Sequence, residues 1–312
     1  MTTSWGLVVR STGSWYDVLA DDGRRISCKV KGSFRLRGIR STNPVAVGDR
    51  VAVREENGAA FITELAERRN FIVRRASNLS KQSHILAANV DACLLVATLR
   101  RPETSTTFMD RCLATAEAYR VAASIAFNKT DLLSATERKE QAALVETYRK
   151  IGYDVFEISA LDTTTLGELR EHLRDKRTLI AGNSGVGKST LLNALIPTAN
   201  VRTAEISEAH QTGMHTTTFS ELYAMPEGGS LIDIPGIKGF GTFNMSREEI
   251  AHYFPEIFHT SRDCRFDNCT HTHEPGCAVQ SALERGEIAP SRFASYLSML
   301  QDEEESKYRE SQ

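Results

Sequence analysis

The sequence predicts a multidomain α/β protein, and three observations support that fold class. Short runs rich in Val, Ile and aromatic residues, separated by turn signals, fill residues 1–68. Strands and helices alternate over residues 69–245. A helical, polar segment with crowded cysteines and histidines spans residues 246–312 and begins with a helix predicted over residues 246–258. A chain of 312 residues is long enough for three domains, and we place their boundaries at these positions.

The first domain is expected to be a β-barrel. Strands are predicted within residues 5–10, 15–20, 24–32, 49–55 and 59–65. Five short strands in so short a stretch favour a small barrel of the oligonucleotide-binding (OB) kind.

A basic stretch lies between the third and fourth of these strands. It surrounds Phe34 with cationic side chains: Lys29, Lys31, Arg35, Arg37 and Arg40. Such side chains neutralise phosphates while an aromatic ring offers a stacking face, so the stretch is a candidate RNA contact. A basic loop that is simply solvated is the alternative.

The middle domain is expected to contain a parallel sheet. Strands are predicted within residues 90–99, 121–131, 154–160 and 177–185, and helices within residues 108–120, 136–152, 165–175 and 188–196. This alternation implies βαβ units. Ligands bind such sheets at the carboxyl ends of the strands, and the motifs of this domain fall at those ends.

The stretch IAGNSGVGKST, residues 180–190, contains the pattern G-x-x-x-x-G-K-[ST] of a phosphate-binding loop. Its glycines let backbone N–H groups wrap the phosphates, Lys188 can reach the β- and γ-phosphate oxygens, and the Ser189 hydroxyl can hold Mg²⁺. The strand before it and the helix after it are the context that such a loop requires. The expected nucleotide-binding residues here are Gly182, Asn183, Ser184, Gly185, Val186, Gly187, Lys188, Ser189 and Thr190.

DIPG, residues 233–236, follows another apolar run and suits the far side of the same phosphates. Asp233 can hold Mg²⁺ through water, and the N–H of Gly236 can sense the γ-phosphate. The pattern D-x-x-G is weak by itself, because both residue types are common in turns. Its position downstream of Lys188 is what makes it informative.

NKTD, residues 128–131, predicts recognition of guanine. The Asp131 carboxylate can accept hydrogen bonds from guanine N1–H and from the N2 amino group, which adenine lacks. Asn128 can steady the loop and face the N7/O6 side, and the aliphatic stem of Lys129 can cover the purine face; Thr130 completes the motif. An ordinary helix N-cap turn is the alternative for these four residues taken alone.

The order of the motifs predicts a circular permutation. Ser159 and Ala160, after the next strand, can offer a backbone N–H to guanine O6, and this base site comes before the phosphate loop. An ordinary small GTPase begins with the phosphate loop and ends with the base loop. Circular permutation moves the chain termini and keeps the geometry of the site. The sequence therefore predicts a circularly permuted GTPase that hydrolyses GTP to GDP.

These motifs resemble those of the circularly permuted, ribosome small-subunit-dependent GTPase A family. The resemblance covers nearly the whole chain, with barrel, permuted GTPase and zinc segment in that order. It is carried by NKTD, GNSGVGKST, GMHTTT, DIPG and CRFDNCTHTHEPGC. It implies a role in late small-subunit assembly, contact with rRNA, and GTP hydrolysis stimulated by the small ribosomal subunit.

GMHTTT, residues 213–218, is expected to cover the Mg²⁺ and the γ-phosphate. A threonine there ligates the metal in the triphosphate state only, and Thr217 is favoured although the sequence does not separate it from Thr216 and Thr218. The resemblance suggests that His215 helps to place the attacking water; a flexible loop histidine is the alternative. The expected catalytic residues are Lys188, His215 and Thr217.

Ile237 follows DIPG, where many GTPases have a glutamine that orients the attacking water. An aliphatic side chain cannot orient water by hydrogen bonding. We therefore expect a low intrinsic rate of hydrolysis and dependence on an activator.

The six cysteines divide into two sets. Three lie in apolar contexts that suit reduced, buried thiols: Cys28, Cys93 and Cys112. The others form the pattern C-x₄-C-x-H-x₅-C near the C-terminus: Cys264, Cys269, His271 and Cys277. Three thiolates and an imidazole fill a tetrahedral zinc site with no open position, which predicts one structural Zn²⁺. His273 is a competing ligand by proximity, and the resemblance favours His271.

Composition limits the remaining function classes. The formal net charge is −2, so any surface that attracts nucleic acid is local. Neither a secretory signal nor an apolar run long enough to cross a bilayer is visible, which predicts a cytoplasmic protein that acts without a membrane. We expect a monomer that associates with the small subunit. Two alternatives remain open: a non-catalytic, GTP-dependent RNA-binding switch, and a GTPase that serves a non-ribosomal partner.

Overall fold

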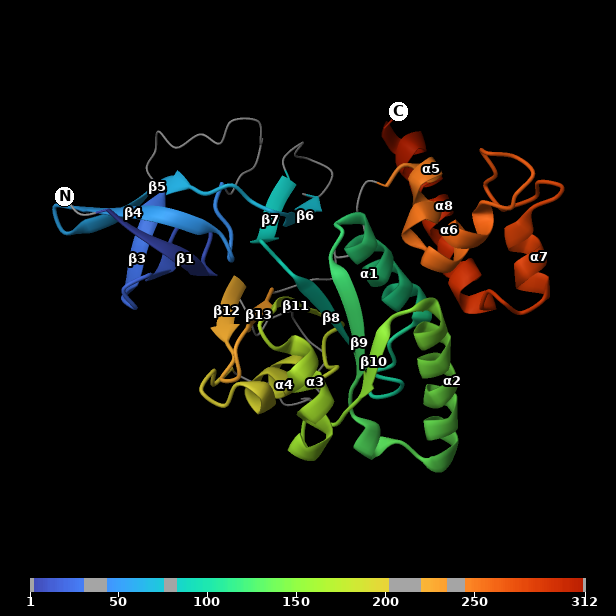
Figure 1. Cartoon of the computed structure of the whole chain (residues 1–312), viewed down its shortest axis with the longest axis horizontal. Helices are drawn as coiled ribbons and strands as arrows, with labels where there is room; N and C mark the ends of the chain where they lie inside the picture. The colour runs from blue at the N-terminus through green and yellow to red at the C-terminus, as the bar shows by residue number, and fades with distance from the viewer. Residues whose placement is uncertain (1–2, 31–43, 76–82, 202–219, 235–244, 311–312) are drawn as a thin grey trace.

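The computed structural model describes residues 3–30, 44–75, 83–201, 220–234 and 245–310. Figure 1 shows three parts in a row: a barrel that contains the N-terminus, a central sheet with helices on its faces, and a helical segment that contains the C-terminus. The central sheet lies between the other two parts.

The N-terminal part is a closed five-stranded barrel, as predicted. Its strands are β1 (Thr3–Ser11), β2 (Tyr16–Ala20), β3 (Arg25–Val30), β4 (Arg50–Glu56) and β5 (Ala59–Leu65). They pair in the order β1-β2-β3-β5-β4, and β4 pairs back with β1 to close the barrel. Buried apolar residues, among them Val18, Val51 and Ile62, alternate with exposed ones and fill the interior. Within the basic stretch, the structure describes Lys29, whose Nζ lies 4.3 Å from the centroid of the Trp15 ring. Residues 31–43 lie outside the described residues.

The central part is a mostly parallel sheet. Five strands run parallel, in the order β10 (Asp154–Glu157), β9 (Ala122–Phe127), β8 (Ala92–Ala97), β11 (Arg177–Ala181) and β13 (Ser230–Asp233). Strand β12 (Ser220–Ala224) lies next to β13 in the sheet and pairs with it in the antiparallel direction. It was not predicted from the sequence.

Helices cover both faces of this sheet. Helices α1 (Thr106–Ala118) and α2 (Ala135–Ile151) pack on one face, and α3 (Gly167–Leu173) and α4 (Lys188–Leu195) on the other. Strand β8 shows why: Cys93 and Leu95 belong to the core under α1 and α2, whereas Leu94 and Val96 belong to the core under α3 and α4. The buried thiols predicted at Cys28, Cys93 and Cys112 are confirmed.

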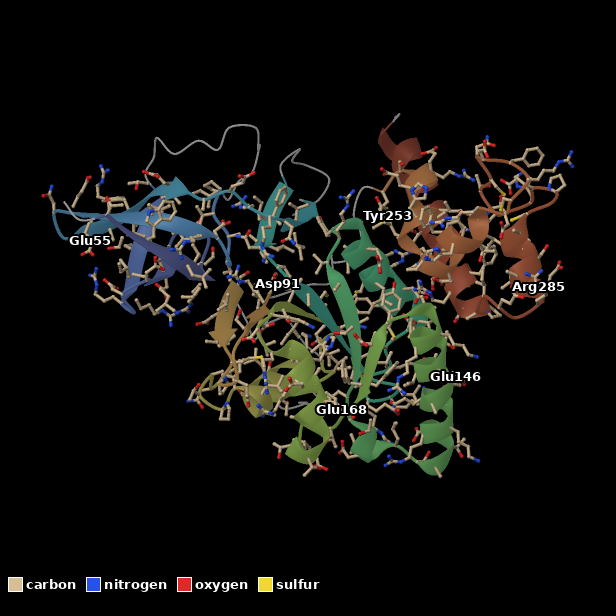
Figure 2. The ribbon with its side chains drawn as sticks, in the orientation of Figure 1. Glu55, Asp91, Glu146, Glu168, Tyr253 and Arg285 are labelled. Carbon is tan, nitrogen blue, oxygen red and sulfur yellow. The ribbon has the colours of Figure 1, made fainter. Side chains whose placement is uncertain are left out.

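The barrel continues the central sheet. Strand β1 pairs with β12 through Arg10↔Glu221 and Ser11↔Ser220. A second, unpredicted element is the two-stranded hairpin of β6 (Phe71–Arg75) and β7 (Ser83–Ala88). Asp91, between the barrel and the parallel strands in Figure 2, accepts hydrogen bonds from Arg69 Nη2 (2.6 Å) and the Arg177 N–H (2.8 Å).

The other edge of the sheet is short and partly occupied. Strand β10 has four residues, and Arg149 on α2 donates from Nη2 to the Val155 carbonyl at 2.6 Å. A carbonyl acceptor of the edge strand is therefore already bonded.

The C-terminal part contains α5 (Arg247–Ile250), α6 (Pro255–Ser261), α7 (Ala278–Glu284) and α8 (Pro290–Glu310). The sequence predicts one helix over residues 246–258, and this prediction is wrong. A 3₁₀ turn, η4 (Ala251–Tyr253), and the extended Phe254 (φ −116°, ψ 94°) interrupt it, because Pro255 cannot donate a helical hydrogen bond and starts α6 instead. Among the described residues, no helix is long and apolar enough to cross a membrane.

A buried ion network joins this part to the central domain. Arg292 on α8 donates from Nη1 to Asp110 Oδ1 on α1 at 2.8 Å, and from Nε to Glu256 Oε1 on α6 at 2.7 Å. Tyr148 on α2 also donates to Asp110 Oδ1, at 2.8 Å. Four helices are thus fixed to one buried guanidinium and its partners.

Candidate nucleotide site and metal site

The predicted nucleotide-binding residues follow the carboxyl ends of neighbouring strands. Residues 128–131 follow β9, residues 158–160 follow β10, residues 182–187 follow β11, and Asp233 ends β13. Since these strands are parallel and adjacent, the loops converge at one edge of the sheet. The sheet brings together segments that the sequence places far apart.

Two glycines of the phosphate loop have no room for a side chain. Gly182 has φ 145°, and a Cβ built on it would lie 2.3 Å from the Val96 carbonyl oxygen. Gly187 has φ 93°, and its Cβ would lie 2.5 Å from Asn128 Nδ2. Glycine is therefore required at both positions by backbone conformation and by contact with neighbouring strands and loops.

Lys188 is held inside the phosphate loop. Its Nζ donates to the carbonyl oxygens of Gly182 (2.8 Å) and Asn183 (2.7 Å). Burial lowers the pKa of Lys188, and the nearby carboxylate of Asp233 opposes that shift. The ammonium is thus oriented by the loop itself, next to a half-buried Ser189 and Thr190 in the first turn of α4.

Asn128 joins three of the loops. Its side chain is 3% exposed. Nδ2 donates to the Val186 carbonyl of the phosphate loop at 2.9 Å, and Oδ1 accepts from the Ala160 N–H at 2.9 Å. The Ala160 N–H, expected to face guanine O6, therefore donates to Asn128 in this structure. Base loop, phosphate loop and the Ser159–Ala160 turn form one hydrogen-bonded unit.

The rest of the base loop is tied to its neighbours. Lys129 has φ 63° and donates from Nζ to the carbonyl oxygens of Arg101 (2.6 Å) and Gly185 (2.7 Å). Burial lowers the pKa of Lys129, opposed by Asp131. Thr130 Oγ1 donates to the Ile158 carbonyl at 3.0 Å, and Asp131 is exposed in the 3₁₀ turn η1 (Thr130–Leu132).

Ser159 is fixed from the turn that follows it. The Ser159 N–H donates to Thr165 Oγ1 at 3.0 Å, and its own Oγ accepts from the Leu161 N–H at 3.3 Å. The turn is therefore shaped by its own side chains, with Ser159 buried.

The phosphate side of the site offers hard oxygen donors. Asp233 is 6% exposed at the end of β13, and the Ser189 hydroxyl is in the first turn of α4. A carboxylate and a hydroxyl are oxygen ligands of the kind that Mg²⁺ prefers. His215, Thr216, Thr217, Thr218, Gly236 and Ile237 lie outside the described residues.

A further segment that the sequence did not indicate belongs to this edge. Residues 98–104 follow β8, and Thr98 and Thr104 close the loop: the Thr104 N–H donates to the Thr98 carbonyl at 2.9 Å, and the Thr98 N–H to Thr104 Oγ1 at 3.1 Å. The loop supplies the Arg101 carbonyl that binds Lys129. Backbone acceptors carry no sequence motif, so no pattern could have identified it.

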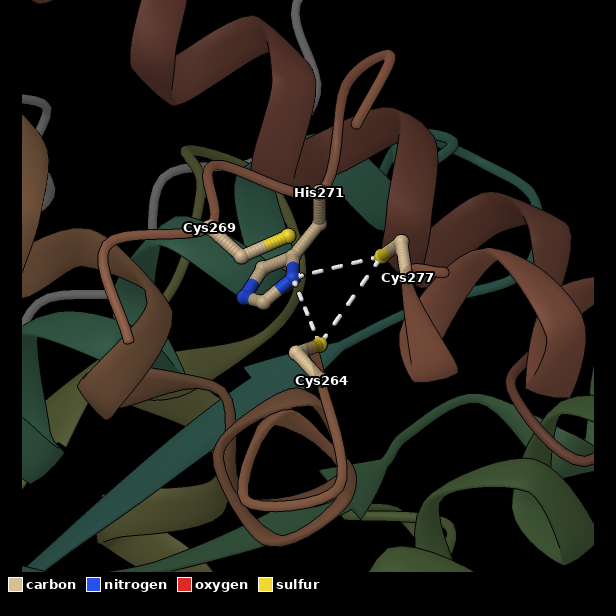
Figure 3. A group of neighbouring side chains, drawn as sticks. All are labelled: Cys264, Cys269, His271 and Cys277. Atoms are coloured by element: carbon tan, nitrogen blue, oxygen red, sulfur yellow. Dashed lines mark hydrogen bonds between the residues drawn. The ribbon is translucent and has the colours of Figure 1, made fainter. Parts of the chain in front are cut away.

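The predicted metal ligands converge in the loop between α6 and α7. Figure 3 shows the imidazole of His271 facing Cys264 and Cys277, with the Cys269 side chain beside it. His271 Nδ1 lies 3.6 Å from Cys264 Sγ and 3.5 Å from Cys277 Sγ, and those two sulfur atoms are 4.0 Å apart. The four ligand atoms lie within 4.8 Å of one another. Around a tetrahedral zinc ion, such atoms lie roughly 3.5–3.8 Å apart, so the donor set fits zinc.

The neighbourhood of the cluster favours His271 over His273. His271 is buried, and Gln280 Nε2 holds its carbonyl oxygen at 2.5 Å. His273 is exposed, and its Nδ1 bonds Thr272 Oγ1 at 2.8 Å, away from the sulfur atoms. Glu274 accepts the backbone N–H groups of residues 270, 272 and 273 and so shapes the loop.

Fold and motif order together define a circularly permuted P-loop GTPase, with an N-terminal barrel and a Cys/His cluster at its C-terminal end. The sequence matches the RsgA GTPase family over residues 65–243 and the RsgA N-terminal domain over residues 5–62. The chain belongs to the RsgA GTPase family, and it is therefore a GTP hydrolase.

Relatives match it over nearly their whole length. The Small ribosomal subunit biogenesis GTPase RsgA of Bacteroides fragilis is 60% identical, over 97% of this chain and 98% of the relative. The protein of the same name from Porphyromonas gingivalis is 56% identical, over 97% and 98%.

Two solved structures also match the chain over nearly its whole length. The crystal structure of YjeQ from Thermotoga maritima matches with a TM-score of 0.78 and 33% identity, over 97% of this chain and 99% of that one. The structure of YloQ, a circularly permuted GTPase, matches with a TM-score of 0.73 and 31% identity, over 98% and 96%.

Proposed function

We propose that the chain binds GTP and Mg²⁺ at the edge formed by the loops after β9, β10, β11 and β13, and hydrolyses GTP there. The observation that carries this proposal is the side chain of Asn128, which bonds the base loop to both the phosphate loop and the Ser159–Ala160 turn. The order of motifs is permuted, yet base-reading and phosphate-binding groups are held as one unit.

Each group has a defined role in this proposal. Asp131 reads guanine N1–H and N2, and the Lys129 stem covers the ring. When nucleotide binds, Lys188 exchanges its two loop carbonyls for phosphate oxygens, so its charge is already positioned where negative charge develops. Ser189, Asp233 and Thr217 would hold Mg²⁺, which would neutralise charge on the phosphates. His215 helps to place the attacking water, and Gly236 senses the γ-phosphate.

The C-terminal cluster is proposed to hold one structural zinc ion through Cys264, Cys269, His271 and Cys277. All four positions of a tetrahedral site are then taken by protein, which leaves no position for substrate. We divide the chain at residues 1–68, 69–245 and 246–312 into barrel, permuted GTPase and zinc-binding domains.

The proposed partner is the small ribosomal subunit, in its biogenesis. Support comes from relatives of that name at up to 60% identity over nearly the full chain, and from the basic stretch between β3 and β4, which offers phosphate contacts. We propose that the protein is a cytoplasmic monomer that associates with the subunit and its rRNA.

The test is GTP hydrolysis by the purified protein, alone and with purified small ribosomal subunits, with Lys188→Ala as the inactive control. We expect slow hydrolysis alone, strong stimulation by subunits, and no stimulation of the variant. If GTP binds and the rate ignores subunits, the ribosomal partner is wrong. If GTP binds and no hydrolysis occurs even with subunits, Ile237 indicates a GTP-dependent binding switch in place of an enzyme.

A further inference from the structure

The loop after β8, residues 98–104, touches both halves of the nucleotide site. Lys129 Nζ donates to the Arg101 carbonyl at 2.6 Å and to the Gly185 carbonyl at 2.7 Å, so one ammonium joins this loop to the base loop and the phosphate loop. Pro102 lies beside the phosphate loop: a Cβ built on Gly185 would be 3.4 Å from Pro102 Cδ.

The side chain of Arg101 adds a separate contact. Its Nη1 donates to the Leu132 carbonyl at 2.9 Å. Leu132 is the last residue of η1, which contains Asp131, the residue that reads guanine. Arg101 is exposed, and its guanidinium bonds the backbone directly after Asp131, the proposed guanine-reading residue.

The loop that carries Arg101 is firmly built. Thr98 and Thr104 are buried and bonded to each other across it. Next to Arg101, Arg100 binds both carboxylate oxygens of Glu140 on α2, at 2.8 and 3.1 Å. These bonds hold the backbone of the loop in place on both sides of Arg101. Arg101 can therefore link the loop after β8 to η1 with little further loss of conformational entropy in the loop.

We propose that Arg101 is a positioning residue for guanine recognition, acting by holding η1 so that Asp131 meets the N1–H and N2 groups of the base. It does not touch the reacting phosphates in this assignment. The inference rests on the proposed guanine-nucleotide site and adds to it a specificity determinant that lies in none of the nucleotide motifs.

The chemistry predicts a selective effect. Inosine diphosphate (IDP) lacks the N2 amino group, so it makes one hydrogen bond fewer to Asp131 than GDP does. A looser η1 weakens GDP binding more than IDP binding, since GDP depends more on that carboxylate. Loss of Arg101 should therefore lower both GDP affinity and the preference for GDP over IDP.

The experiment uses isothermal titration calorimetry of the full chain with GDP and with IDP. Arg101→Ala and Arg101→Lys are compared with wild type. Residue 101 has a φ of 61°, a conformation that glycine adopts more readily than other residues, so both variants keep a Cβ to leave this backbone preference unchanged. Arg138→Ala, an exposed arginine on α2, is the control that removes the same charge. Thermal unfolding and the split between kcat and KM for GTP accompany each variant.

We expect Arg101→Ala to weaken GDP about fivefold and IDP about twofold, with partial recovery in Arg101→Lys and none of this in Arg138→Ala. KM for GTP should rise while kcat stays unchanged, and the unfolding temperature should not move. An unchanged GDP/IDP ratio in Arg101→Ala, or an equal loss in Arg138→Ala, overturns the inference. If wild type binds neither GDP nor IDP, the proposed function itself has failed.

Discussion

The nucleotide site and the metal site are built in opposite ways. The first gathers residues between positions 98 and 233 from the ends of parallel strands, and its polar groups already bond one another: Lys188 to its own loop, Lys129 to two others. The second gathers its residues from a single loop, positions 264–277, where three sulfur atoms and a ring nitrogen face the same point. The hydrophobic core of the sheet positions the first site, whereas in our proposal a bound zinc ion stabilises the second.

The two sites should therefore tolerate different perturbations. A site set by strand ends tolerates permutation of the chain, because hydrogen bonds between loops do not depend on the order in which strands are connected. A site set by ligand spacing does not tolerate loss of a ligand or of its ion. Four measurements test this contrast.

The largest effect is expected from zinc removal. Binding of a structural zinc contributes on the order of 10 kcal/mol to the folding of a small domain, so chelation should unfold the loop between α6 and α7. GDP binding by the central domain should persist. Hydrogen exchange of residues 262–280, read beside GDP calorimetry, checks both. The His271→Ala variant should lose the zinc ion, and the His273→Ala variant should keep it. Loss of GDP binding together with loss of zinc would contradict the contrast between the two sites.

The second effect is at the junction between the two parts. Arg292→Met leaves the buried carboxylate of Asp110 and the half-buried carboxylate of Glu256 without their cationic partner, which should lower the free energy of unfolding by about 3–5 kcal/mol. Urea unfolding measures it. Arg111→Met is the matched control, because Arg111 pairs with the exposed Asp302 and should cost below about 1 kcal/mol. Equal losses in the two variants would show that burial of Arg292 is not decisive.

The third effect is within the nucleotide site. Asn128→Ala leaves the Val186 carbonyl and the Ala160 N–H without their partner, at about 1–3 kcal/mol each, and should weaken GDP binding by at least about tenfold. Asn193→Ala removes a similar pair of bonds, to the N–H and carbonyl of Val201, without touching the joined loops. It should cost stability and leave the GDP dissociation constant unchanged. Calorimetry separates the two.

The smallest effect lies at the amino ends of the same strands. Burial alone would raise the pKa of Asp91, but the hydrogen bond from the Arg177 N–H and the pairing with Arg69 together lower it. A lowered carboxyl pKa means stability that is present above the unfolded-state value, about 4, and is lost as pH falls through the folded-state value. Asp91→Asn should therefore be less stable than wild type at pH 7, by roughly 0.5–1 kcal/mol because the pair is partly exposed, and this gap should shrink near pH 3.

Urea unfolding at the two pH values measures that gap, and a constant difference would refute the assignment. GDP affinity should not respond, because Asp91 is at the end of β8 away from the nucleotide loops.

Prediction from the sequence succeeded where a pattern is repeated or local. The barrel strands alternate, β8, β9 and β11 are strongly apolar, and the candidate metal ligands are close neighbours in the sequence, so each was predictable. Strand β12, with the sequence SELYA, is short and half polar, and it becomes a strand only because β13 and β1 flank it. The helix break at Phe254 could have been found from the proline that follows it.

Polar contacts between residues far apart in the chain could not be predicted from the sequence. Asp110 and Arg292 are separated by 182 positions, and neither is part of a motif. The contact between residues 98–104 and Lys129 uses the Arg101 carbonyl oxygen, a group that every residue has. Such contacts can be identified only once the fold is known, because no local pattern in the sequence marks the residues that make them.

The pairing of β1 with β12 has a consequence for association between molecules. A sheet edge with free N–H and C=O groups is a template on which other chains can add strands and aggregate. Here the barrel takes up one flank of the central sheet and, through the return of β4 to β1, closes on itself. The other flank is the four-residue β10, where Arg149 already occupies a carbonyl. Among the described strands, the large sheet therefore offers little edge to which a strand of another chain could add.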